Sequence, residues 1–283
     1  MIMLLEIRYK MKKNYLFLVI LFLFGSYSSY GQSFKGDFKD ALEAGDMAKA
    51  EKILLAWDFA DANDPEIYVA YFNFYTVKSL EKDSTKYDME YVRQALDYIS
   101  NGIAFFPTRF DMRLGKIYML IRIEDYKSVT AEVIKLINYS KEIDNDWKGE
   151  NYSLIERPDE MLNGAVQEFQ GILFSKEDPA LYDDIIKISE EMLKCYPTHS
   201  QSLLNISTAY VMKKNYDKSL EALLKAVQMR PKNAVYHYNI AYVYEKKGDK
   251  ENAGKHYKLA VDNASEKEQK LKEAAQKRLD LLR

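Results

Sequence analysis

The side chains able to carry out nucleophilic or metal chemistry are few in this sequence. It contains three histidines, His199, His237 and His256, and a single cysteine, Cys195. None of the histidines belongs to a spacing that binds metal ions, such as H-E-x-x-H. Cys195 lies in the apolar helical stretch IIKISEEMLKCYP, which favours a packed, unreactive thiol. We therefore predict no metal site and no cofactor.

The acidic pairs Asp183-Asp184 and Glu190-Glu191 could supply acid–base chemistry only if both carboxylates faced one substrate. Adjacent residues on a helix point about 100° apart, so each pair is expected to belong to a solvated face instead. The sequence also lacks a G-x-S-x-G nucleophile motif and a glycine-rich phosphate loop after a strand. We predict that the protein is not an enzyme. A site assembled from scattered residues is the alternative.

Composition narrows the class of fold and of partner. The chain has 283 residues, of which 47% are hydrophobic and 30% charged, with 11 Gly and 6 Pro. This is enough apolar material for a substantial core and too few chain breakers for a β-sandwich. The net charge of −2 argues against a nucleic-acid binder, which needs a basic field to displace counterions from phosphates.

The N-terminal stretch has the three-part layout of a secretory signal peptide. Lysines precede residue 14, the apolar run YLFLVILFLF covers residues 15–24, and the small-residue run GSYSSYG covers residues 25–31. The apolar run is far shorter than the ~20 residues that a stable transmembrane helix needs. We predict a leader in residues 1–31, cleaved between Gly31 and Gln32, which leaves no stable membrane span. An uncleaved anchor and a buried core helix are the alternatives.

The surroundings of this leader predict the compartment. Met11 followed by two lysines would begin a leader of ordinary length, so we expect residues 1–10 to be an upstream extension. No cysteine follows the apolar run directly, which argues against a lipoprotein. The leader resembles those of exported proteins of Gram-negative bacteria, so we expect a periplasmic or secreted protein.

The rest of the sequence is helical in pattern, with apolar residues at spacings of three and four and breakers between the periodic stretches. Asp64-Pro65 and Asp178-Pro179 each predict a helix start, with an N-cap carboxylate and proline at the first helical position. The segment 144–159, DNDWKGENYSLIERPD, is the longest stretch without periodicity. We expect it to be a loop between helical repeats in 32–143 and 160–265, either functional or a simple insertion.

Two passages of the sequence resemble each other at an interval of 34 residues. NISTAYVMKKNYDKSLEALLKAVQMRPKN begins at Asn205, and NIAYVYEKKGDKENAGKHYKLAVDN begins at Asn239. Self-similarity at a fixed period in a helical chain indicates a solenoid of stacked helix pairs. Residues 200–233 and 234–267 resemble two tetratricopeptide repeats in register. The resemblance is carried by Leu203, Ile206, Ser207, Tyr210, Ser219, Leu223, Ala226 and Pro231 in the first copy and by His237, Ile240, Ala241, Tyr244, Ala253, Tyr257 and Ala260 in the second.

The resemblance implies an all-α fold, a right-handed solenoid of antiparallel helix pairs, and residues 44–57 and 113–137 resemble degenerate copies. Small residues are expected where paired helices cross. They are Ser207, Ser219, Ala241 and Ala253. Residues 266–283 are expected to form a C-terminal capping helix that begins with a Ser265/Glu268 capping box. A partner-binding tail is the alternative for this segment.

The resemblance also implies a function. In tetratricopeptide-repeat proteins the first helices of the pairs line a groove that receives a peptide or a helix of a partner. The matching positions are Leu204, Asn205, Thr208 and Met212 in the first copy and Tyr238, Asn239, Tyr242 and Lys246 in the second. The amides of Asn205 and Asn239 are expected either to pair with a peptide backbone or to bond within the repeat.

We predict a non-catalytic, exported scaffold that holds a protein or peptide partner of unknown identity in the cell envelope. The alternative is a periplasmic protein that binds a small ligand or glycan through a tyrosine-rich groove. Two stretches dense in aromatic residues motivate it, EIYVAYFNFYTV in 66–77 and AVYHYNIAYVY in 234–244. Packing between helices is the simpler role for these rings, and we favour it.

Overall fold

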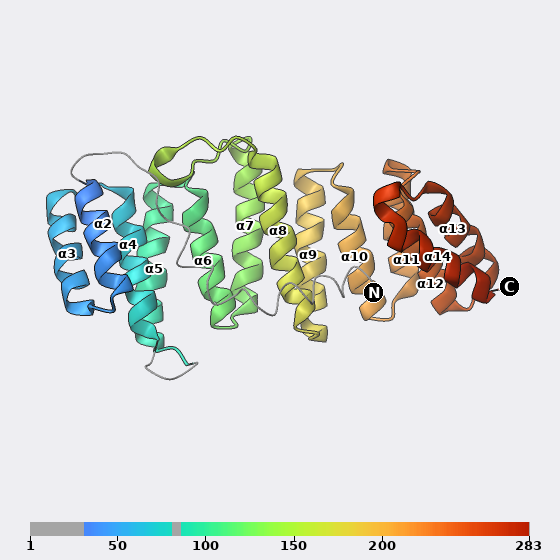
Figure 1. The fold of residues 1–283 in the computed structure, drawn as a ribbon, viewed down its shortest axis with the longest axis horizontal. Helices are drawn as coiled ribbons and strands as arrows, with labels where there is room; N and C mark the ends of the chain where they lie inside the picture. Colours follow the sequence, from blue (N-terminus) through green and yellow to red (C-terminus); the bar gives the residue numbers. More distant parts are fainter. Residues whose placement is uncertain (1–30, 81–85, 283) are drawn as a thin grey trace. The chain divides into compact units, whose positions relative to one another are not determined.

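The computed structural model describes residues 31–80 and 86–282, which form α-helices joined by short turns (Figure 1). Within these two ranges there is no strand, and the only β-type pairing consists of isolated bridges. The predicted all-α fold of repeated helix pairs is confirmed. The predicted leader covers residues 1–31. All of it except Gly31, the first residue of α2, lies outside the described residues.

The chain divides into two compact units, Met1–Gln167 and Glu168–Arg283, with the boundary inside α8 (Pro158–Ser175). The first unit contains α2 (Gly31–Glu43), α3 (Met47–Ala60), α4 (Pro65–Ser79), α5 (Met89–Phe105), α6 (Phe110–Arg122), α7 (Tyr126–Glu142) and the 3₁₀ turn η1 (Glu150–Tyr152). The second contains α9 (Pro179–Cys195), α10 (Ser200–Met212), α11 (Tyr216–Met229), α12 (Ala234–Lys247), α13 (Lys250–Asn263), the 3₁₀ turn η2 (Glu266–Glu268) and α14 (Gln269–Leu282). The predicted limits of the N- and C-terminal repeats stay predictions.

Short polar side chains start most of these helices. The carboxylates of Asp64 and Asp178 accept the backbone N–H two residues on and are followed by proline, as predicted. The side chains of Asn215, Asn233 and Asp249 cap α11, α12 and α13, and each accepts the backbone N–H of the residue three positions further on. Each cap satisfies a backbone donor that the first turn of a helix leaves without a partner.

The turn between two paired helices needs a left-handed residue. Gly248 ends α12 with φ +81°, and Lys214 occupies the equivalent turn after α10 with φ +58°. In both turns the next N–H bonds the carbonyl five residues back, Asp249 to Tyr244 and Asn215 to Tyr210, both at 2.8–3.0 Å. Glycine adopts this conformation without the strain that a Cβ atom adds.

Substitution by alanine should change the free energy of unfolding in opposite directions at two glycines of the second unit. A Cβ atom at Gly248 would meet no atom within 4 Å, so Gly248→Ala should lose about 1 kcal/mol of unfolding free energy through backbone strain alone. Gly171, inside α8, is equally uncrowded and helical, so Gly171→Ala should gain about 0.5–1 kcal/mol. Urea denaturation followed by circular dichroism measures both. Equal effects of the two substitutions would contradict the assignment of Gly248 to a strained turn.

In the second unit, small side chains lie where the two helices of each repeat cross, and they allow the helices to approach closely. Ser207 and Ser219 are buried, and their hydroxyl oxygens lie 2.7 Å apart between α10 and α11. Ala241 and Ala253 are fully buried between α12 and α13. The larger side chains around them form the core, with Leu223, Ile240 and Val243 in one cluster. These crossings confirm the predicted role of the small residues.

The last helix, α14, packs against α13 and α12 within the second unit. Ser265 and Glu268 form the predicted capping box at its approach. Ala275 is fully buried against Ala253 and Tyr257, and Leu279 and Leu282 pack against the same cluster. The opposite face is charged and exposed, so α14 closes this end of the repeats as predicted.

In the first unit, segment 144–157 folds back on the start of α6. Trp147 is fully buried, its indole N–H donates to Ser140 Oγ at 2.9 Å, and its ring meets Phe110 edge-on at 5.1 Å. The backbone N–H of Phe110 donates to Lys148 O, and the N–H of Lys148 donates to Thr108 O. The predicted loop is therefore a packed segment anchored by one aromatic side chain.

Candidate partner-binding site

The predicted groove residues of α10 are divided between the core and the surface. Leu204 is buried in the cluster around Leu223. Asn205 is only 8% exposed, and its amide nitrogen donates to Gln170 Oε1 of α8 at 2.7 Å. Thr208 is half-buried and donates back to Leu204 O, while Met212 is 42% exposed. Of these four, only Met212 is exposed.

The predicted residues of α12 are more accessible. Tyr238 is half-buried with its ring edge-on to Tyr257 at 5.5 Å, and Tyr242 is half-buried beneath the ammonium of Lys246, 5.3 Å from the ring centroid. Asn239 donates to Val235 O at 2.7 Å in its own helix. Lys246 is exposed.

For both asparagines the hydrogen bonds seen here are internal to the chain, one to α8 and one to α12. The Asn239 side chain keeps partial exposure and the Asn205 side chain does not. The accessible part of the predicted groove therefore consists of two exposed and four half-buried side chains, Met212 and Lys246 and then Thr208, Tyr238, Asn239 and Tyr242. That these residues bind a partner stays a prediction.

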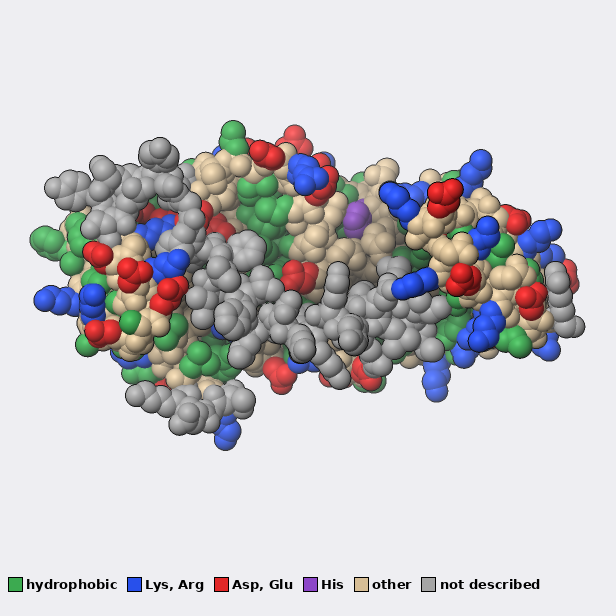
Figure 2. All heavy atoms as spheres, viewed as in Figure 1, with side chains coloured by type: hydrophobic (Ala, Val, Ile, Leu, Met, Phe, Trp, Pro, Cys, Tyr) green, Lys and Arg blue, Asp and Glu red, His purple; other side chains and the backbone are tan. Residues whose placement is uncertain are grey.

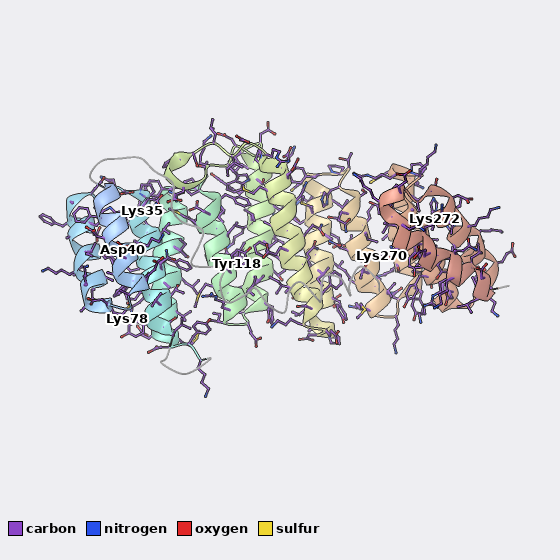
Figure 3. All side chains as sticks on the ribbon, in the orientation of Figure 1. Lys35, Asp40, Lys78, Tyr118, Lys270 and Lys272 are labelled. Carbon is purple, nitrogen blue, oxygen red and sulfur yellow. The ribbon has the colours of Figure 1, made fainter. Side chains whose placement is uncertain are left out.

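The tyrosines of α4 and α5 form a stacked ladder in the first unit. Tyr98 lies on Tyr71 with ring centroids 4.1 Å apart and on Tyr75 at 5.6 Å, and Tyr75 stacks on Tyr91 at 6.2 Å. The Lys78 ammonium closes the ladder, 4.9 Å from the Tyr91 ring (Figure 3). The Tyr71 hydroxyl donates to Asp58 at 2.9 Å. The tyrosine rings pack against one another, which supports the packing role for the aromatic-rich stretch in 66–77.

A buried ion cluster lies near the other end of α4. Arg109, which is fully buried, donates from Nε and Nη2 to the two carboxylate oxygens of Asp111 at 2.8 and 2.7 Å. Its Nη1 lies 2.7 Å from Glu66 Oε1. Lys35 on α2 pairs with Glu66 at 3.0 Å and also with Glu150 of η1 (Figure 3). The cluster thus joins α2, α4, α6 and segment 144–157.

The charges of the cluster support one another. Burial raises the pKa of Glu66, but Arg109 and Lys35 outweigh it and hold that pKa below the usual range. Burial lowers the pKa of Arg109, and Asp111 and Glu66 outweigh that effect, so the guanidinium stays charged. Because removing one partner leaves a buried charge uncompensated, such clusters are costly to break.

We expect Glu66→Gln to destabilise the first unit by about 3–5 kcal/mol at pH 7, because Arg109 loses a buried partner. A carboxyl whose pKa is lowered on folding stabilises the protein above its unfolded pKa and loses that contribution as pH falls through the folded pKa. The difference between variant and parent should therefore shrink below about pH 4.5. Urea unfolding between pH 3 and 7 measures it.

Glu90→Gln is the matched control, since Glu90 pairs with Arg93 on the exposed face of α5. It should leave stability nearly unchanged. A pH-independent loss in Glu66→Gln would show that side-chain packing, not charge, is what the substitution removes.

A cleft of about 620 Å³ opens in the second unit between α9, α10 and α11. Its floor is α10, with Leu203, Ile206 and Tyr210. Its walls are Glu190 and Leu193 on α9 and Lys218, Glu221, Ala222, Lys225, Gln228 and Met229 on α11. Sequence reasoning assigned these α11 residues no role, because on a single helix they read as an ordinary charged face. Charges of both signs alternate over the surface of this unit (Figure 2).

The histidines take part in internal contacts. His237 is buried, with Nε2 2.8 Å from Pro231 O and Nδ1 3.2 Å from His256 Nδ1. Burial, and to a lesser degree His237, lowers the pKa of His256, and burial together with Arg230 lowers that of His199. Within residues 31–80 and 86–282, no three His, Cys, Asp or Glu side chains converge in a way that would hold a metal ion.

Two protein-family models match parts of the chain. A TPR-repeat model matches residues 208–248, and a tetratricopeptide-repeat model matches residues 234–267. Residues 208–267 therefore contain tetratricopeptide repeats. The matched residues cover α11, α12 and α13 and reach into α10, the helices predicted from the sequence repeat.

Solved structures with similar repeats include YrrB, described as a TPR protein with an unusual peptide-binding site. It is 15% identical over 77% of this chain and 96% of its own, with a TM-score of 0.43. MamA from Desulfovibrio magneticus RS-1 is 15% identical over 84% and 97%, with a TM-score of 0.30. A tetratricopeptide-repeat protein from Parabacteroides merdae is 13% identical over 89% and 98%, with a TM-score of 0.34. Values this low give no guide to what the present chain binds. Curated protein sequences gave no significant match.

Proposed function

We propose that this tetratricopeptide-repeat protein is a non-catalytic scaffold that binds a protein or peptide partner, and that it does so after export to the cell envelope. The matched repeats in residues 208–267 carry the proposal. Such repeats are protein-interaction modules, and two of them stand here in tandem with an accessible set of side chains on their first helices, Met212 on α10 and Asn239, Tyr242 and Lys246 on α12.

The absence of a catalytic role is supported by what the reactive groups do. His237 contacts His256 and the backbone carbonyl of Pro231, and Cys195 is half-buried. The strongest cluster of charges, around Arg109, pairs each carboxylate with a cation. These groups hold helices together, and the scaffold is the function that their geometry supports best. For the tyrosine-rich ligand groove, the stacked ladder of α4 and α5 offers no specific support.

Export is tested by the fate of the leader. No described helix is both long and apolar enough to cross a bilayer. Expressed in a Gram-negative host with its own leader, the protein should appear in the periplasmic fraction or the medium, with Gln32 as its first residue by N-terminal sequencing. Retention in the cytoplasm at full length would contradict export. Membrane association at full length would support an uncleaved anchor.

Partner binding is tested by cross-linked capture from the native cell envelope. The variant Met212→Glu/Lys246→Glu places two charges on the accessible first-helix side chains without touching the core. We expect it to lose at least about tenfold of the captured partner, because charge repulsion and lost apolar contact act on the exposed side chains of the first helices. The control Leu259→Glu/Lys258→Glu makes the same changes on exposed positions of α13. Equal losses in both variants would move the site away from the first helices, and no captured protein at all would contradict the scaffold.

A further inference from the structure

The cleft between α9, α10 and α11 lies on the side of the repeats formed by the second helices, away from the predicted groove residues. Its floor is apolar, with Leu203 and Ile206 buried and Tyr210 half-buried. Its rim is charged and exposed, and Lys225 on it pairs with Glu221 at 2.8 Å. The Lys218 ammonium lies 5.3 Å from the centroid of the Tyr210 ring. The cleft thus combines an open apolar floor with two lysines at its rim.

The first unit contains the same turn ahead of the corresponding helix. There the N–H groups of Asp61, Asp64 and Ile67 donate to Trp57 O, Asp61 O and Asp64 O. In the second unit Tyr196, His199 and Ser202 donate to Met192 O, Tyr196 O and His199 O in the same order. These bonds place α4 in register with α10. Tyr71 then corresponds to Ile206 and Tyr75 to Tyr210.

The following helices are related by their N-caps. Val92 donates to Asp88 O at the start of α5, and Ser219 donates to Asn215 O at the start of α11. With the caps aligned, Ala95 corresponds to Ala222, and both are buried. Tyr91 then corresponds to Lys218 and Tyr98 to Lys225. The two lysines of the cleft thus stand where the first unit has two tyrosines.

Those two tyrosines stack on rings of α4 in the first unit. The Tyr98 ring lies on Tyr71 and Tyr75, nearly parallel to both at 11° and 17°, and Tyr91 stacks on Tyr75. Lys78 adds its ammonium to the Tyr75 and Tyr91 rings. In the second unit the floor ring, Tyr210, remains and a lysine still lies over it, but the stacked rings from the neighbouring helix are missing. The first unit therefore has aromatic rings at positions whose counterparts border the cleft in the second.

We propose that the cleft between α9, α10 and α11 is a docking site for an aromatic side chain presented by a partner polypeptide, which stacks on Tyr210 between Lys218 and Lys225. The inference rests on the proposed scaffold function and gives it a second surface and a recognition chemistry. An aromatic ring is favoured over an aliphatic side chain because it gains both the stacking contact and the cation–π contact of the lysines.

The test uses the full chain, expressed with its own leader and purified in the form that the cell produces. The probes are the acetylated, amidated pentapeptide Ser-Gly-Tyr-Gly-Ser, its analogue with leucine in place of tyrosine, and N-acetyl-tyrosinamide, with affinities measured by isothermal titration calorimetry. The tyrosine pentapeptide should bind about fivefold more tightly than the leucine analogue.

The variant Lys218→Tyr/Lys225→Tyr reproduces the first unit and should fill the cleft with its own rings. We expect it to lose at least about tenfold of the affinity for the tyrosine peptide and to melt at a higher temperature. Lys250→Tyr/Lys258→Tyr makes the same changes on exposed positions of α13 and should bind like the parent. Tyr210→Leu keeps an apolar floor but removes the ring. It tests the site if the filled variant does not fold, and it should erase the preference for tyrosine over leucine.

Equal binding of the tyrosine and leucine peptides, or unchanged binding by both the filled variant and Tyr210→Leu, would overturn the proposal. So would the absence of peptide binding. Binding of N-acetyl-tyrosinamide as tight as that of the pentapeptide would overturn the assignment to a polypeptide and make the cleft a small-molecule site. Failure of the scaffold is read separately, because the capture experiment with Met212→Glu/Lys246→Glu concerns the other face.

Discussion

A helix pair of a repeat cannot bury its apolar face alone, and the packing of the described helices depends on that constraint. It requires paired helices to approach closely, which the Ser207–Ser219 contact and the Ala241–Ala253 contact allow. It also requires larger side chains between pairs, and Leu204 and Asn205 are taken into that space. A surface for partners is what remains after the stacking requirement has been met, and so the predicted groove is only partly accessible.

The two units meet this constraint with different chemistry. The second repeats a regular motif and uses hydroxyls, alanines and aliphatic side chains. The first replaces much of that with a ladder of tyrosine rings along α4 and α5 and with an ion cluster around fully buried Arg109. The cluster joins four segments distant in sequence, and Trp147 seals the fourth against α6. Degenerate repeats can thus be held by specific polar and aromatic contacts where the regular small-residue pattern is lost.

A cleft opens between α9, α10 and α11, whereas tyrosine rings stack at the matched positions of α4 and α5. The backbone turns and helix caps correspond, so the space between second helices is formed in both. Tyr91 and Tyr98 fill it in the first unit, whereas Lys218 and Lys225 leave it open in the second. The side chains at the matched positions differ, with Ile206 for Tyr71 as well as Lys218 and Lys225 for Tyr91 and Tyr98, and they decide how far this space is filled.

The sequence by itself determined the all-α class, the helix starts at Asp64 and Asp178, the tandem repeats in 200–267 and the closing helix with its Ser265/Glu268 box. These follow from local signals: a period of 3.6, cap residues and a fixed repeat length. Only the tertiary structure decided that Asn205 bonds Gln170, that Arg109 is buried among carboxylates, and that Lys218 and Lys225 border an apolar cleft. Each depends on helices that are brought together by packing, and a single helix carries no signal for which of its polar side chains a neighbour will cover.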